Sequence, residues 1–281
     1  MATVYLNREY LPADEARVSV NDRGFMLADG VYEVTPVYKG KLFLYDRHQA
    51  RLERGLRDVR IDYDRSGLAE VHDRLIAANG LGDADTAMVY LQVTRGVAPR
   101  THPFPDPPVL PTVYAFAKAW QRPSREQWEK GIRVITAPDN RWLRVDIKTI
   151  QLLPNALAMQ AAADADAQNA IFIRDGVVTE GGHANLFAVL DGTLTTHPAN
   201  HLVLHGITRG LVLELAQTLG LSVQERPFTD EELFAADEVF LTGTTTEISP
   251  VVAVDGSPVG NGRVGAMTRQ LRAAFMEAVG G

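Results

Sequence analysis

The sequence of 281 residues contains no cysteine and no excess of positive charge. Without cysteine there is no disulfide framework, no cysteine-liganded zinc or iron–sulfur site and no thiol nucleophile. The 28 basic residues are outnumbered by 35 acidic ones, and a net charge of −7 argues against binding to nucleic acid. No stretch approaches the roughly 20 apolar residues of a membrane span, and charged residues interrupt the first residues before an apolar signal segment forms. We therefore expect a cytoplasmic protein without membrane or nucleic-acid partners.

The rest of the composition is that of a folded protein, with 46% hydrophobic and 22% charged residues. Apolar periodicity and turn residues predict strands over 31–37, 41–45, 88–94 and 113–117, and helices over 48–57, 67–79, 155–167, 208–219 and 264–278. Such a mixture without a regular strand–helix–strand rhythm favours an α+β fold. A linker over 120–124 would separate a small N-terminal domain (1–119) from a larger C-terminal domain (125–281).

Two patterns that resemble binding motifs are interpreted as structural. Residues 260–265 read G-x-G-x-x-G, but too few residues follow to complete a dinucleotide-binding unit, so we expect a turn. His197, His201 and His205 are four residues apart, yet Pro198 and the apolar residues around them predict a strand or loop instead of a helix. We expect no metal site.

Lysine is scarce, and one of the five lysines has an unusual setting. Lys148 lies between Ile147 and Ile150 in a segment (142–153) interpreted as a strand, where alternation would place it on the same face as Asp146. A lysine in apolar surroundings is a candidate Schiff-base nucleophile. The alternative, which spacing alone favours, is a solvated or ion-paired lysine on a strand edge.

A Schiff base to pyridoxal phosphate also requires a phosphate site and a carboxylate. Gly206 precedes a predicted helix, whose first N–H groups and the Thr208 hydroxyl suit a phosphate. The hydroxyl-rich stretch 242–247 is a second candidate, with an ordinary polar turn as its alternative. Arg51 either adds a charge or is a surface arginine. Glu180 ends an apolar strand, where either a pyridinium nitrogen or an arginine is a suitable partner.

Several segments, taken in order, resemble the fold type IV pyridoxal-phosphate-dependent aminotransferases, and among them the D-amino-acid transaminases, over nearly the whole chain. These segments are Asp22-Arg23-Gly24, 29–34, His48-x-x-Arg51-Leu52, 93–102, 141–148, 178–181, 196–200, 206–209 and 244–248.

This resemblance implies two domains, a small N-terminal α+β domain and a larger barrel-like α/β domain, with pyridoxal 5′-phosphate in the cleft. It implies that Lys148 is the Schiff-base lysine and catalytic acid/base, and that Glu180 binds the pyridine nitrogen. The implied phosphate ligands are Arg51, Ile207, Thr208 and Thr244, and Leu204 would pack against the ring. The implied ligands of the substrate α-carboxylate are Tyr32, Arg100 and His102, the last two from the partner subunit of a homodimer.

The implied reaction is transamination between a D-amino acid, such as D-alanine, and a 2-oxo acid, such as 2-oxoglutarate. A branched-chain L-amino-acid transaminase is the nearest alternative because it shares the cofactor machinery. Aminodeoxychorismate lyase is a further alternative, against which Arg100 and His102 argue, and a non-enzymatic cofactor carrier is the last. The sequence departs from the family after Glu180, where a Gly-Gly-His-Ala-Asn stretch (181–185) replaces a serine-rich run. We expect the cofactor contacts and the side-chain pocket to differ there.

Overall fold

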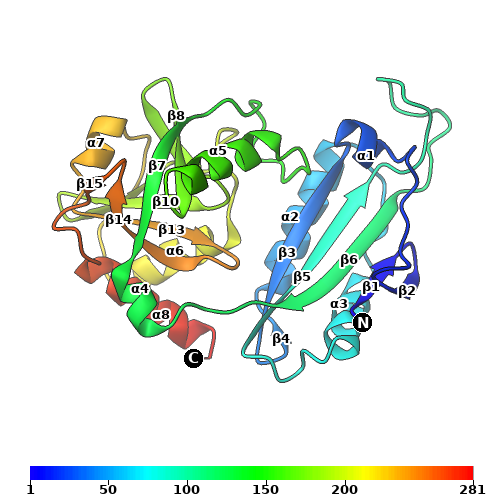
Figure 1. The fold of residues 1–281 in the computed structure, drawn as a ribbon, viewed down its shortest axis with the longest axis horizontal. Coiled ribbons are helices and arrows are strands. Elements are labelled where there is room, and N and C mark those ends of the chain that lie inside the picture. The colour runs from blue at the N-terminus through cyan, green and yellow to red at the C-terminus, as the bar shows by residue number, and fades with distance from the viewer. Residues whose placement is uncertain (281) are drawn as a thin grey trace. The chain divides into compact units, whose positions relative to one another are not determined.

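The computed structural model describes residues 1–280 and divides into two compact units. Unit 1 comprises Met1–Gln121 together with Ile147–Gln151, and unit 2 comprises Arg122–Asp146 together with the chain from Leu152 onward. Their mixed helix and strand content, visible in Figure 1, confirms the predicted α+β class. Within residues 1–280, no helix has the length and apolar character needed to span a membrane.

Unit 1 is built on a six-stranded sheet in the order β2-β1-β6-β5-β3-β4, with every neighbouring pair antiparallel. Helices α2 and α3 contribute Leu52, Leu56 and Leu75 to one hydrophobic core with Val31 and Val89 of the sheet. The elements of unit 1 are β1 (Thr3–Leu6), β2 (Glu9–Pro12), α1 (Arg23–Leu27), β3 (Gly30–Tyr38), β4 (Lys41–Leu42), α2 (Tyr45–Asp58), α3 (Leu68–Ala78), β5 (Thr86–Thr94) and β6 (Thr112–Ala119).

Strand β3 presents alternate residues to the two faces of its sheet. Val31 and Glu33 are buried on the face covered by helices, whereas Tyr32 is only partly buried on the opposite face. Gly30 begins the strand at a close approach, because a Cβ atom there would lie 2.7 Å from the carbonyl oxygen of Val93. The first residues of β3 and their neighbours are therefore fixed in position.

Unit 2 is built on a nine-stranded sheet, whose main path runs β12-β11-β10-β13-β14-β7-β8-β9 with β15 paired to β14. Helices α6 and α8 contact each other and β13, and α5 contacts β7 and β8. The elements of unit 2 are α4 (Arg125–Lys130), β7 (Ile132–Pro138), α5 (Leu153–Asp164), β8 (Asn169–Arg174), β9 (Val177–Gly181), β10 (Asn185–Leu190), β11 (Thr193–Thr196), α6 (Ile207–Thr218), β12 (Val223–Glu225), α7 (Asp230–Phe234), β13 (Glu238–Gly243), β14 (Glu247–Val254), β15 (Ser257–Pro258) and α8 (Ala266–Ala278).

Two local predictions are wrong. The segment 142–153 is not a strand: it runs through bends and turns, and only Thr149 makes an isolated bridge, to Val31. The strand predicted over 41–45 ends at Leu42, because helix α2 already begins at Tyr45. In the segment 142–153, long-range backbone hydrogen bonds override the local alternation of apolar residues: Val145 donates to His201, and residues 148–150 bond to strand β3.

The chain passes between the units three times. The first division falls between Gln121 and Arg122, inside the segment interpreted as a linker. Residues 147–151, expected in the C-terminal domain, group instead with unit 1. Hydrogen bonds explain this grouping: the Tyr32 N–H donates to the carbonyl of Lys148 (3.0 Å) and the Ile150 N–H donates to the carbonyl of Gly30 (3.2 Å).

Candidate active site

Lys148 is held against the start of strand β3 by its own backbone. Its carbonyl accepts from Tyr32, and its Nζ lies over the Tyr32 ring, 4.2 Å from the ring centroid. Within residues 1–280, Nζ forms no ion pair with a carboxylate, and the neighbouring Asp146 is paired with Arg144 (3.0 Å). The ion-paired alternative therefore does not describe Lys148. The amine is placed by its backbone and left available for covalent chemistry, as a cofactor-binding lysine requires.

Arg51 lies on helix α2 and binds the buried carboxylate of Glu33. Its Nε and Nη2 donate to the two Glu33 oxygens at 2.9 and 2.5 Å, and the Nδ1 atom of His48 lies 2.9 Å from the same carboxylate. Burial alone would raise the pKa of Glu33, but the Arg51 guanidinium and His48 outweigh it and hold the pKa far below its usual range. Arg51 is thus an oriented, buried cation and not a surface arginine.

Glu180 stands at the end of β9 as a buried carboxylate with several donors. Its Oε1 accepts from Arg141, while its Oε2 accepts from the Asn185 side chain (3.0 Å) and the Leu204 N–H (2.9 Å). Burial raises the pKa of the Glu180 carboxyl, and the Arg141 guanidinium and the Leu204 N–H oppose that rise. Arg141 is itself fixed by Asp139 through two 2.8 Å hydrogen bonds. The arginine predicted as an alternative partner is present, and the carboxylate is oriented by it.

The two candidate phosphate-binding segments both border Asn185. Helix α6 begins after Gly206 without a side-chain cap, so its first N–H groups have no helical acceptor. A Cβ on Gly206 would lie 1.9 Å from the Asn185 side-chain oxygen, so the approach requires glycine. Asn185 pairs across the strands with Thr242, just before the turn that carries Thr244. The buried Thr242 hydroxyl has no hydrogen-bond partner within residues 1–280. Free donors and an orphaned hydroxyl fit an anionic group such as a phosphate.

Half-buried Leu204, Ile207 and Thr208 belong to this same part of unit 2. The side chain of Asn185 links the Glu180 carboxylate to the carbonyl of Leu204 at 2.8 Å, two residues before Gly206. Unit 2 therefore brings Glu180, Leu204 and the start of α6 together.

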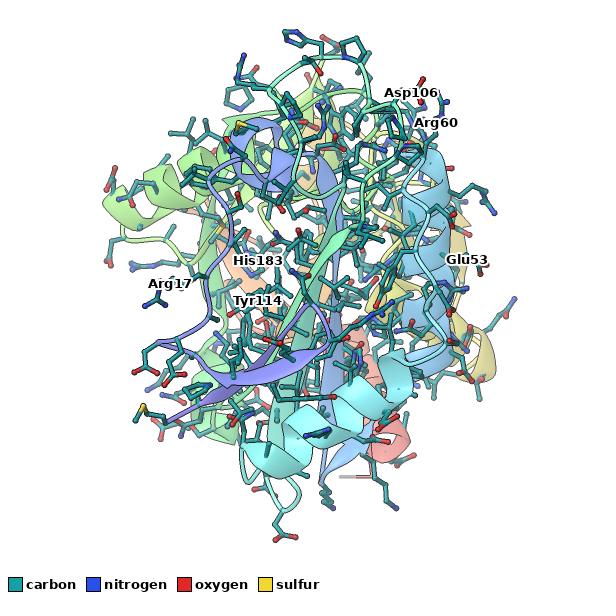
Figure 2. All side chains as sticks on the ribbon, turned by 90° about the vertical axis from the view of Figure 1, so that its right-hand side faces the viewer. Arg17, Glu53, Arg60, Asp106, Tyr114 and His183 are labelled. Carbon is teal, nitrogen blue, oxygen red and sulfur yellow. The ribbon has the colours of Figure 1, made fainter. Side chains whose placement is uncertain are left out.

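Arg100 and His102 lie on the Pro-rich loop between β5 and β6, and both are exposed. Figure 2 shows Arg60 at the same end of unit 1 as Asp106 of this loop. Tyr32, the third predicted carboxylate ligand, stacks on Tyr90 with ring centroids 5.6 Å apart. Unit 1 by itself does not bring the loop side chains into contact with Tyr32.

The stretch after Glu180 forms a tight turn. The Gly181 N–H donates to the carbonyl of Ala184 (2.7 Å), and a Cβ on Gly182 would lie 2.5 Å from the sulfur of Met159. A serine at position 182 would therefore force Met159 to move. His183 is exposed at the tip of this turn.

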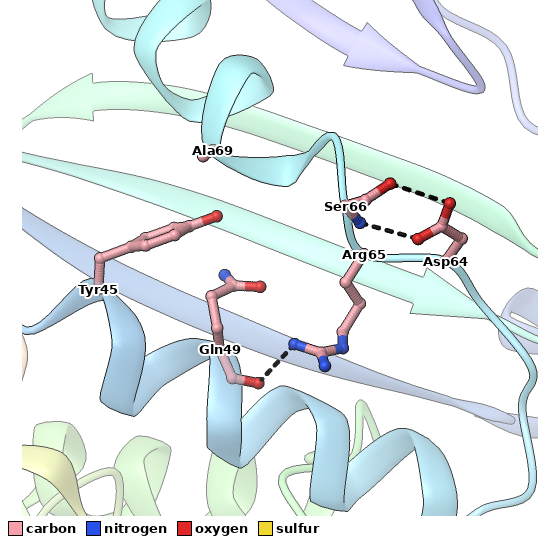
Figure 3. Close-up of a pocket in the computed structure, with 6 residues that line it drawn as sticks. All are labelled: Tyr45, Gln49, Asp64, Arg65, Ser66 and Ala69. Carbon is pink, nitrogen blue, oxygen red and sulfur yellow. Dashed lines mark hydrogen bonds between the residues drawn. The ribbon is translucent and has the colours of Figure 1, made fainter.

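A pocket in unit 1 contains none of these residues. Tyr45, Gln49 and Arg65 line it, with Asp64, Ser66 and Ala69, and Arg65 donates to the Gln49 carbonyl at 3.3 Å (Figure 3). The predicted site residues lie elsewhere, so this pocket is not part of the candidate site.

Sequence patterns alone assign no role to Glu33, Asp139, Arg141 or Asn185, which orient the predicted site residues. Glu33 carries a signal that identifies it: it has the same parity in its strand as Val31 and Val37, and a carboxylate on an apolar face requires a partner. Asp139 and Arg141 follow strand β7, and the contact of Arg141 with Glu180 is a tertiary one that a local sequence pattern does not display.

Curated proteins similar to this chain are D-alanine aminotransferases. That of Staphylococcus aureus (strain MSSA476) is 41% identical over 277 residues, covering 98% of this chain and 97% of the relative. That of Bacillus licheniformis is 41% identical over 276 residues, covering 98% and 96%. The resemblance inferred from the short segments is confirmed by this similarity over nearly the full chain.

Solved structures with the same fold are branched-chain amino acid aminotransferases. The T.th. structure with pyridoxamine 5′-phosphate has a TM-score of 0.89 at 29% identity, covering 99% of this chain and 94% of that chain. The Escherichia coli structure has a TM-score of 0.87 at 28% identity, covering 98% and 93%. The model of the family described as amino-transferase class IV matches residues 30–254. The chain therefore belongs to the amino-transferase class IV family and is a pyridoxal-phosphate-dependent aminotransferase of fold type IV.

Proposed function

We propose that this enzyme transfers the amino group of a D-amino acid, such as D-alanine, to a 2-oxo acid, such as 2-oxoglutarate. The observation that carries the proposal is the 41% identity to D-alanine aminotransferases over 98% of the chain. Identity to the two branched-chain enzymes of the same fold described above is lower, at 28–29%. Because the two groups share a fold, the substrate assignment rests on sequence and not on backbone shape.

Lys148 is the residue to which we assign the proton transfer. When bound, pyridoxal phosphate supplies an electron sink for the negative charge that develops on the substrate α-carbon. Nζ of Lys148 would hold the cofactor and, when not bonded to it, would accept and return the α-proton. Its position beside the Tyr32 ring, without an ion-paired carboxylate among residues 1–280, supports this role because no carboxylate engages the amine.

Unit 2 would supply the remaining cofactor contacts except that of Arg51, which belongs to helix α2 of unit 1. Glu180 would bind the pyridine nitrogen and keep it protonated, and Leu204 would pack against the ring. Ile207, Thr208 and Thr244 would donate to the phosphate, together with the oriented guanidinium of Arg51. The uncapped start of α6 and the unpartnered Thr242 hydroxyl support this assignment, since both offer hydrogen bonds that no protein group takes up.

Tyr32, Arg100 and His102 bind the substrate α-carboxylate in this proposal, with Arg100 and His102 donated by the partner subunit of a homodimer. The exposure of both loop side chains supports a shared site, because it lets them reach another chain. We further propose that the enzyme works in the cytoplasm, where the absence of cysteine is compatible with reducing conditions.

The half-reaction separates this proposal from its alternative. D-alanine and L-leucine are added in turn to the enzyme loaded with pyridoxal phosphate, and the cofactor spectrum is followed without a 2-oxo acid. We expect conversion to the amino form of the cofactor with D-alanine and a much slower change with L-leucine. Rapid conversion by L-leucine alone would establish the branched-chain activity named for the solved structures with this fold, and would refute the D-amino-acid assignment.

A further inference from the structure

The loop that carries Arg100 and His102 is anchored at the residue between them. Nη1 of Arg23 donates to the carbonyl of Thr101 at 2.6 Å. The side chains at positions 100 and 102 are exposed, whereas Arg23 is only 2% exposed. The buried Arg23 cation thus fixes the backbone between Arg100 and His102, whose exposed side chains can face a ligand.

Arg23 is itself positioned by Asp29. Its Nε donates to the Asp29 carboxylate at 2.8 Å, and Arg95 donates to both oxygens of the same carboxylate at 2.8 and 3.0 Å. Arg95 also donates to the carbonyls of Val59 (2.6 Å) and Arg60 (2.8 Å), at the end of helix α2. The Asp29 carboxylate therefore accepts hydrogen bonds from two arginines. Arg23 binds the loop, and Arg95 binds the backbone at the end of helix α2.

A second contact holds the same loop three residues further on. The Phe104 ring stacks on the Arg95 guanidinium, 3.5 Å from the ring centroid, and Arg60 lies 5.5 Å from that centroid. Figure 2 shows Arg60 close to this end of the loop, near Asp106. The hydrogen bond to Thr101 and the contact with Phe104 together bracket His102.

The ion pairs of Asp29 with Arg23 and Arg95 are not explained by their contribution to folding stability. Buried ion pairs contribute little net stability, because desolvation offsets most of the attraction. Buried ion pairs do fix the relative positions of the groups that they join. A site that binds a planar carboxylate depends on the exact positions of its donors. We call Arg23, Asp29, Arg95 and Phe104 the loop anchor.

We propose that the loop anchor positions Arg100 and His102 for the substrate α-carboxylate, with Arg23 as its principal positioning residue. The inference rests on the proposed function, in which these two side chains bind that carboxylate. Arg23 does not touch the substrate; it acts through the Thr101 carbonyl.

The test measures carboxylate binding separately from chemistry. Propionate has a carboxylate but no amino group, so its inhibition constant against D-alanine in the holoenzyme reports that contact alone. We expect Arg23→Ala to raise the inhibition constant about tenfold, and to raise KM for D-alanine more than it lowers kcat. Phe104→Ala, which removes a partly exposed ring and leaves the buried charges intact, raises it about two- to fivefold.

Two reference variants make the result decisive. Arg100→Ala removes the direct contact and raises the constant about tenfold to a hundredfold. Adding Arg23→Ala to it raises the constant less than Arg23→Ala does in the wild type, because only the His102 contact is left for the anchor to position. Asn79→Ala is the matched control: it removes three hydrogen bonds to the backbone of Thr3 and Leu75 elsewhere in unit 1 and leaves the constant unchanged.

The failures are distinguishable. If Arg100→Ala raises the inhibition constant while Arg23→Ala and Phe104→Ala do not, the anchor is purely structural and this inference is overturned. If Arg100→Ala itself has no effect, the carboxylate role in the proposed function is wrong, and the inference fails with it. If Asn79→Ala raises the inhibition constant as much as Arg23→Ala does, the increase reflects general destabilisation of unit 1. That result would also overturn the inference.

Discussion

Replacement of Glu180 by glutamine tests whether its carboxylate is held as the structure describes. The carboxylate accepts from three donors: Arg141 on one oxygen, and Asn185 and Leu204 on the other. Glutamine has one acceptor oxygen and one NH2 group. Whichever way the amide turns, its NH2 group faces at least one of these donors. Glu180→Gln therefore leaves a buried donor unsatisfied, in addition to removing the charge.

The expected loss of stability follows from the contacts. A hydrogen bond to a charged group contributes about 1.5–3 kcal/mol, and an unsatisfied buried donor costs a similar amount. We expect a loss of about 2–3 kcal/mol, since the flexible amide relaxes part of the mismatch. For a domain of about 150–250 residues, each 1 kcal/mol shifts the melting temperature by about 2–4 °C, so the fall is about 4–12 °C.

The assay is thermal unfolding of the cofactor-free protein, because bound cofactor would add its own stability. Glu129→Gln is the matched control in the same unit: Glu129 pairs with Arg269 at 2.6 Å, and the side chains of the two residues are 33% and 47% exposed. Exposed pairs contribute about 0–1 kcal/mol, so this variant should melt within about 4 °C of the wild type. Equal melting temperatures for Glu180→Gln and Glu129→Gln would refute the network around Glu180.

The same variant tests the catalytic role. A neutral amide does not stabilise a protonated pyridine nitrogen, so the electron sink weakens. Below its melting temperature, reconstituted Glu180→Gln should run the D-alanine half-reaction at least a hundredfold more slowly than the wild type, as measured by stopped-flow absorbance. A rate within about threefold of the wild type would contradict the assignment of Glu180 to the pyridine nitrogen.

Three further predictions follow from the same contacts. Borohydride reduction of the holoenzyme should attach the cofactor to Lys148, as peptide mapping will show; attachment to Lys118 would refute the assignment, and Lys148→Ala should abolish transamination. Arg100→Ala chains mixed with Lys148→Ala chains should regain part of the activity after verified subunit exchange, because a mixed dimer has one intact shared site; no recovery would place Arg100 and Lys148 of one chain in the same site. Burial would raise the pKa of Asp139, but hydrogen bonds from Arg141 and Arg174 lower it to about 2, so Asp139 contributes about 2 kcal/mol above pH 4 that is lost as the pH falls through about 2. Urea unfolding should show the advantage of the wild type over Asp139→Asn shrinking across that range, and a constant difference would contradict it.

Much of the architecture could be predicted because its signals are local. Apolar periodicity and turn residues predicted helices over 155–167 and 208–219, which correspond to α5 and α6 within a few residues at each end. The strand around Lys148 could not be rejected locally, since its alternation of apolar and polar residues satisfies the pattern. Its true conformation is set by hydrogen bonds to Gly30 and Tyr32, more than a hundred residues earlier in the chain. Pairings of this kind are invisible to a local pattern.

Some residues of the candidate site could be predicted from local signals in the sequence, and others could not. Lys148, Glu180 and the start of α6 carry chemical signals that a sequence displays, namely a rare lysine, a carboxylate in an apolar strand and a glycine before a helix. The residues that orient them do not. Asn185 reaches both Glu180 and the carbonyl of Leu204, and only the folded sheet brings these two together. The orientation of a site residue depends on tertiary contacts, whereas its chemical reactivity can be inferred from its residue type.

Strand β3 positions a predicted site residue on one face and an orienting residue on the other. Neighbouring residues of a strand point to opposite faces, so Tyr32 faces Lys148 while Glu33 faces the α2 side, where it binds Arg51. A slip of one residue in the pairing of β3 with β5 would exchange the two faces and destroy both contacts. The register is secured by continuous pairing from Gly30 with Thr94 to Tyr38 with Thr86, and by the close approach that only glycine permits at position 30. The position of Lys148 and the orientation of Arg51 therefore depend on the same strand register, because the residues that they contact, Tyr32 and Glu33, are neighbours in β3.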